Sequence, residues 1–135
     1  MIEYSEEGDT VMFGSYLEGK EEGYWIYKVG DSREEGKYFE GRRQGEWKVF
    51  YADNSLKFIG SYIDGNPNGK HYFYWPEGLV KLEGKYVMGI KQGKWIRYNR
   101  DGSILIVIDY KNGVEVKYDG IKVNPPLEDS GPGIE

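Results

Sequence analysis

The sequence contains a single histidine, His71, and no cysteine, so the two side chains most often used as catalytic base, thiol nucleophile or zinc ligand are almost missing. A zinc site needs three or more ligands, and one histidine leaves only carboxylates to complete the set. The absence of cysteine excludes disulfides, thiolate metal sites, iron–sulfur clusters and a cysteine nucleophile. We therefore expect no metal centre and no bound cofactor.

Other catalytic patterns are also absent from the sequence. It has no G-x-S-x-G elbow for a serine nucleophile and no G-x-x-x-x-G-K-[ST] phosphate loop. Neighbouring carboxylates occur at Glu21 and Glu22 and at Glu34 and Glu35. Solvated charge explains them best, because charged side chains on strands and loops keep sheet edges from pairing. We assign no catalytic residue and predict that the protein is not an enzyme.

The most basic stretch interleaves cations with aromatic rings. It contains Lys91, Lys94, Arg97 and Arg100 together with Trp95 and Tyr98, and such a mixture suits an interface or cation–π contacts. The net charge of −5 is uneven: residues 1–46 carry 12 acids and 6 bases, and residues 47–118 carry 11 bases and 7 acids. This excess of four bases is small for a nucleic-acid partner, which we do not expect. An anionic lipid headgroup, a polysaccharide or an acidic protein fits better.

A repeat organises most of the chain. Gly14, Gly36, Gly60 and Gly84 begin units of the form G-x-Y-x-x-G-x-x-x-G-x-W, and Ile108 takes the glycine place in a fifth. His71 occupies the tryptophan place of its unit, so we interpret it as a stacking residue rather than a catalytic one. The units are 22 or 24 residues long, and the shorter first one predicts a tighter turn between Trp25 and Gly30.

We expect each unit to form two strands, because Gly or Asn separates runs of alternating aromatic and aliphatic residues. We predict an all-β fold of stacked hairpins in an elongated, curved, open antiparallel sheet without substantial helix. Residues 1–118 form one domain of about five repeats, and residues 119–135, rich in proline and glycine, form a cap or tail that does not continue the ladder. The expected repeat boundaries are 4–13, 14–35, 36–59, 60–83, 84–107 and 108–118, the first and last being partial.

The segments Gly36–Trp47 and Gly84–Trp95 give the repeat its clearest form. They resemble MORN repeats (membrane occupation and recognition nexus), closest to the bacterial variant found in YwqK-type antitoxins, over roughly residues 4–118. The resemblance implies stacked hairpins, a role in scaffolding or protein contact, association of some members with acidic phospholipids, and no common catalytic residue. His71 for Trp, Asn54 for the turn glycine and Ile108 for the leading glycine depart from the pattern.

We therefore expect a non-enzymatic protein–protein interaction or scaffolding module, with a toxin as partner in the antitoxin version. The alternative is peripheral binding of anionic membrane lipid or polysaccharide through Lys91, Lys94, Arg97 and Arg100. No apolar run is long enough to span a bilayer and residues 1–4 do not resemble a signal peptide, so a cytoplasmic location is expected. Because the sheet has open edges, we expect a monomer or an edge-to-edge dimer. The aromatic anchors expected for a protein partner are Trp25, Trp47, Trp95, Tyr27, Phe50, Tyr74 and Tyr98.

Overall fold

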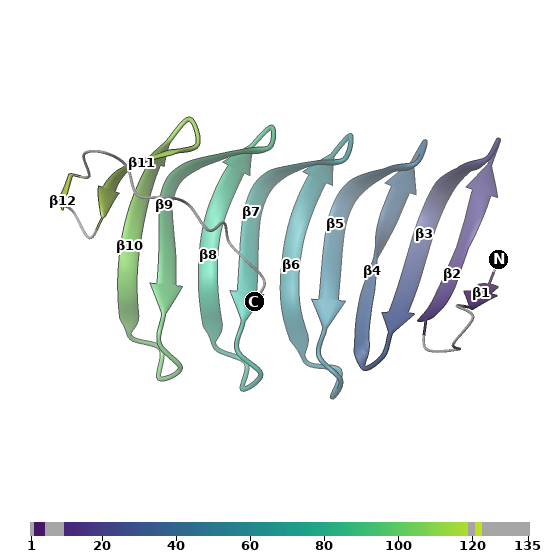
Figure 1. Ribbon diagram of the computed structural model, residues 1–135, viewed down its shortest axis with the longest axis horizontal. Coiled ribbons are helices and arrows are strands. Elements are labelled where there is room, and N and C mark those ends of the chain that lie inside the picture. Colours follow the sequence, from purple (N-terminus) through teal and green to yellow (C-terminus); the bar gives the residue numbers. More distant parts are fainter. Residues whose placement is uncertain (1, 5–9, 119–120, 123–135) are drawn as a thin grey trace.

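The computed structural model describes residues 2–4, 10–118 and 121–122 as one twelve-stranded antiparallel sheet. Every strand pairs with its neighbours in sequence, and the strands lie side by side in a single open row (Figure 1). The described residues contain no helix, so the predicted all-β class of stacked hairpins is confirmed. The strands are β1 (Ile2–Tyr4), β2 (Thr10–Leu17), β3 (Lys20–Val29), β4 (Ser32–Phe39), β5 (Arg42–Phe50), β6 (Leu56–Ile63), β7 (Asn66–Tyr74), β8 (Val80–Val87), β9 (Ile90–Tyr98), β10 (Ile104–Lys111), β11 (Val114–Tyr118) and β12 (Ile121–Lys122).

The strands are joined by turns at both of their ends. At one end of the strands, here called the turn edge, lie five two-residue hairpin turns. In each turn the first residue has φ between 48° and 52° and the second is a glycine with φ between 79° and 85°. Two successive positive φ values define the type I′ turn, whose twist matches that of the strands it joins. The first positions are occupied by Glu18, Glu40, Asp64, Met88 and Asn112.

The opposite edge, the loop edge, carries longer connections. Residues 51–55, 75–79 and 99–103 form loops of one design, in which the first residue donates its backbone N–H to the carbonyl of the fifth. The fourth residue has positive φ in all three, and Asn54 takes the place that glycine holds in the other two. Between β3 and β4 only Gly30 and Asp31 remain. The predicted tighter connection is therefore confirmed, but it lies at Gly30 and Asp31 rather than between Trp25 and Gly30, because β3 continues to Val29.

The C-terminal strand extends the sheet further than predicted. Residues Ile121–Lys122 pair as β12 with Lys117 and Tyr118 of β11. The expectation that residues 119–135 do not continue the ladder is thus wrong at these two positions, where no proline intervenes. Residues 119–120 and 123–135 lie outside the described residues, so a cap or tail there stays a prediction.

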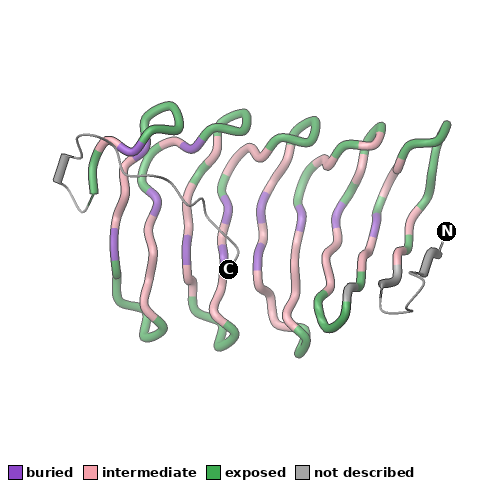
Figure 2. The backbone as a smooth tube through the Cα atoms, viewed as in Figure 1, coloured by how far each residue is buried: buried purple, intermediate pink, exposed green. Residues whose placement is uncertain are grey.

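The two sides of the sheet differ in composition, and a buried band crosses the middle of the strands (Figure 2). On one side, the tryptophan face, Trp25 lies opposite Gly36, Trp47 opposite Gly36 and Gly60, and His71 opposite Gly60 and Gly84. The other side, the lysine face, carries the residues that alternate with these, including most of the lysines of β4–β9.

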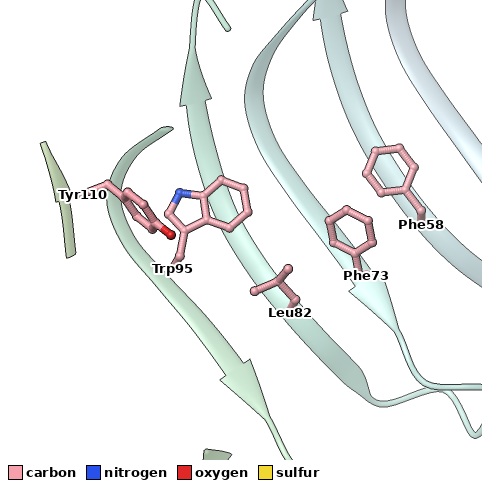
Figure 3. Close-up of a cluster of buried hydrophobic side chains, with 5 residues drawn as sticks. All are labelled: Phe58, Phe73, Leu82, Trp95 and Tyr110. Carbon is pink, nitrogen blue, oxygen red and sulfur yellow. The ribbon is translucent and has the colours of Figure 1, made fainter. Parts of the chain in front are cut away.

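The glycines of this row make room for rings. A Cβ atom built on Gly14, Gly36 or Gly84 would lie closer than 3.0 Å to the indole of the tryptophan on the next strand. The rings therefore lie flat over the glycine backbone. Farther along the tryptophan face, Phe58, Phe73, Leu82, Trp95 and Tyr110 form a buried cluster contributed by five consecutive strands (Figure 3). The sheet thus buries its core within a single layer.

Candidate functional site

The three tryptophans of the row and His71 share one hydrogen-bond geometry. Trp25, Trp47 and Trp95 donate from Nε1 to the carbonyl ten residues earlier, at 3.1, 2.9 and 3.2 Å. His71 Nε2 lies 3.1 Å from the carbonyl of Ser61 in the same position. Burial lowers the pKa of His71, which favours the neutral ring. His71 therefore takes the place of an indole in the packing of the sheet, and its ring is buried among other side chains.

The ring of Phe58 fills the space that the smaller imidazole leaves. Its centroid lies 5.4 Å from that of His71, and its Cζ atom would be 2.6 Å from a Cβ atom built on Gly60. In the next unit Leu82 holds the place of Phe58. The large phenylalanine and the small histidine, which lie on neighbouring strands of successive units, thus compensate each other.

The predicted tryptophan anchors do not face solvent. Trp25, Trp47 and Trp95 are 1%, 0% and 2% exposed. Tyr27 is stacked between Trp25 and Trp47, with centroid distances of 5.7 and 6.5 Å, and it donates its hydroxyl to Tyr38 at 3.0 Å. Because this chain's own side chains cover the indoles, the tryptophans support the sheet and are not available as a contact surface.

The other predicted aromatic anchors lie on the opposite side. Phe50, Tyr74 and Tyr98 occupy equivalent places on the lysine face near the loop edge, and all three are half-buried. The guanidinium of Arg33 lies 4.1 Å from the ring centre of Phe50. Tyr98 donates to Glu83 Oε1 at 2.5 Å, which raises the pKa of Tyr98 to about 12. The predicted anchors are therefore divided between two faces and do not line one groove.

The predicted basic cluster is also divided. Lys91 is buried on the tryptophan face, with its Nζ 5.1 Å from the ring centre of Trp95. Arg97 lies on the same face. Lys94 lies on the lysine face, 3.3 Å from Asp109. Arg100 lies in a loop, where Glu77 pairs with it at 3.1 Å. These four cations do not form one anion-binding patch.

A different set of side chains is exposed in a regular pattern. The residue before each of the first four type I′ turns is apolar, and so are the residues that directly follow the fourth and fifth turns. We call these six residues the apolar stripe. Its members are 38–60% exposed and lie on the lysine face along the turn edge. Successive members before the turns are two strands apart, or about 10 Å. The apolar stripe consists of Leu17, Phe39, Ile63, Val87, Ile90 and Val114.

Next to the stripe, the lysine face is hollowed over β7, β8 and β9. The hollow, here called the basic hollow, has a volume of about 250 Å³. Lys70 and Lys85, which lie directly opposite each other, flank it, and Lys94 and Tyr72 line it further. Gly84 and Gly93 also line it and add no side chain.

Sequence reasoning missed a ladder of polar side chains that joins successive units. Gln44 Oε1 accepts the backbone N–H of Asp64 at 3.0 Å, and Asn68 Oδ1 accepts that of Met88 at 2.8 Å. Glu22 and Gln92 make the equivalent bonds to the neighbouring turns. The signal was available, because an Asn, Gln or Glu precedes the third glycine in each of the first four units.

Within the described residues, no three His, Asp or Glu side chains lie close enough together to hold a metal ion. The same part of the chain forms no helix that could cross a membrane.

No protein-family model and no curated protein matches the chain. Among solved structures it is similar to the crystal structure of TarM, with 16% identity, coverage of 84% of this chain and 21% of that chain, and a TM-score of 0.44. A mutant of S. aureus TarM in complex with Fondaparinux, alpha-GlcNAc-glycerol and UDP gives 14% identity, 88% and 21% coverage, and a TM-score of 0.39. The chain spans about a fifth of the length of these proteins. Similarity at this level assigns neither a family nor an activity.

Proposed function

We propose that the protein is a non-enzymatic interaction module that binds another protein through the apolar stripe. The observation that carries this proposal is the exposure of apolar side chains at one repeated place on the turn edge. Single exposed apolar residues are ordinary, but a regular series of them is typical of a contact surface. The stripe takes the role that the sequence suggested for the tryptophans.

The shape of the sheet supports the same function. A single layer of hairpins has a large surface for its length, which suits recognition of an extended partner. An extended partner can contact several units at once. In the antitoxin version of this proposal the partner is a toxin, and binding along the stripe silences it.

The test is capture of partners from a lysate of the source cells by the immobilised chain. The variant Phe39→Asp/Val87→Asp places two carboxylates in the stripe, and Leu79→Asp/Leu105→Asp makes the same change at exposed apolar residues outside it. We expect one protein in stoichiometric amount that survives high salt, is lost with the stripe variant and is retained with the control.

Binding measured with the two purified proteins must give the same result: the parent and the control variant bind the partner, and the stripe variant does not. A partner for the antitoxin version should also arrest growth when produced alone and not when produced with this chain. If both variants retain the captured protein, or both lose it, the stripe is not its binding surface.

A further inference from the structure

We propose that the basic hollow is a binding site for a tetrahedral oxyanion, the dianionic group of a phosphate monoester. This site lies beside the apolar stripe and does not depend on the protein interaction proposed above. It uses residues of β7 and β8 that lie outside the basic stretch singled out in the sequence.

The first argument is the arrangement of charge. Lys70 and Lys85 are directly opposite residues of neighbouring strands, and like charges in this arrangement destabilise a sheet. Neither ammonium forms an ion pair with an acidic side chain of the described residues, whereas Lys94 pairs with Asp109. An arrangement that costs stability in the free protein is compensated when a dianion lies between the two ammonium groups.

The second argument is the set of donors and the space between them. The hollow of about 250 Å³ is lined by Lys70, Lys85 and Tyr72, and also by Gly93, which adds no side chain to it. Glu83 is the one carboxylate in the lining, and its Oε1 already accepts the hydroxyl of Tyr98 at 2.5 Å. The ammonium groups of Lys70 and Lys85 are the donors that suit the oxygens of a tetrahedral dianion.

The test is a titration of the full chain with inorganic phosphate at about pH 8, where inorganic phosphate is mainly the dianion and a phosphate monoester, with a second pKa of about 6, is a dianion as well. Backbone amide signals are followed by NMR, and sodium chloride at matched ionic strength serves as the reference. We expect saturable shifts confined to the lining of the hollow in phosphate and none in chloride. Shifts that are equal in both salts would overturn the site.

The matched variants are Lys85→Gln in the hollow and Lys37→Gln, an exposed lysine of the same face outside it. Lys85→Gln should weaken phosphate binding about tenfold, which corresponds to about 1.4 kcal/mol, and Lys37→Gln should leave it unchanged. In the absence of anion Lys85→Gln should unfold at the same or a higher temperature than the parent, since it removes the repulsion from Lys70. Equal weakening by both variants would refute specific binding in the hollow.

Two further probes identify the source of the anion. Glycerol 3-phosphate presents a soluble monoester, and phosphatidylcholine vesicles containing phosphatidic acid present the same group at a lipid surface. Saturation by the soluble ester, lost in Lys85→Gln, assigns the site to a free metabolite. Sedimentation with the vesicles alone, lost in the same variant, assigns it to a headgroup. No Lys85-dependent binding of either probe would overturn the proposal.

Discussion

Replacement of Gly84 by alanine tests whether the tryptophan rows determine the stability of the sheet. Gly84 has ordinary strand geometry, so alanine there should stabilise an unobstructed strand by about 0.5–1 kcal/mol. In this structure the new Cβ would overlap the indole of Trp95. The ring must then move, which costs about 1–3 kcal/mol in overpacking and about 1 kcal/mol for the lost bond to the Lys85 carbonyl. We expect a net loss of about 2 kcal/mol in the free energy of unfolding, a central value of these three terms.

The assay is urea unfolding followed by far-ultraviolet circular dichroism, together with the near-ultraviolet signal of the indoles. The control is a double-mutant cycle with Trp95→Ala, which alone should cost about 3–5 kcal/mol. In that background the Cβ has space, so Gly84→Ala should become neutral or stabilising, giving a coupling of about 2–3 kcal/mol. If Gly84→Ala alone is as stable as the parent and its near-ultraviolet spectrum is unchanged, the indole of Trp95 does not require glycine at position 84.

Three further predictions follow from the contacts between units. Because burial lowers the pKa of His71 below its ordinary value of about 6.5, stability is full above that pH and is lost as the pH falls through the folded pKa; urea midpoints at several pH values should show this, and Phe58→Leu/His71→Trp should remove the dependence. Gln44→Ala should cost about 1 kcal/mol and increase hydrogen exchange at the amide of Asp64, whereas Gln44→Glu should retain protection. Met88→Asn should raise the melting temperature, gaining about 0.5 kcal/mol, since asparagine tolerates the φ of 48° better than methionine; an unchanged or lower value would contradict the turn assignment.

The hairpins were predictable because their signals are local. A Gly or Asn between alternating runs indicates a turn, and the 22-residue first unit predicted a shorter connection, which the structure places at Gly30 and Asp31. The strand around Trp47 was harder, because aromatic residues occur in both of its phases. One phase holds Trp47 and forms the core, and the other holds Phe50 and belongs to the lysine face.

The burial of the tryptophans was not predictable from composition. An aromatic row on a single-layer sheet can be open or closed, and the outcome depends on which residue lies opposite each ring. Gly36 and Gly84 allow the indoles of Trp47 and Trp95 to lie flat on the neighbouring backbone. The leading glycines were recognised as part of the repeat, but their partners on the next strand are set by register. For the same reason Lys70 and Lys85 were not seen as a pair.

Because the repeats lie in a single row, the length of the sheet depends directly on the number of repeats. Each full unit adds two strands, or about 10 Å, in the direction across the strands and leaves the cross-section unchanged. The polar ladder from Gln44 to Asp64 fixes each added unit to the one before it. Gain or loss of one unit of 24 residues would therefore change the distance between the ends of the sheet in steps of one size, while every remaining unit keeps its own contacts.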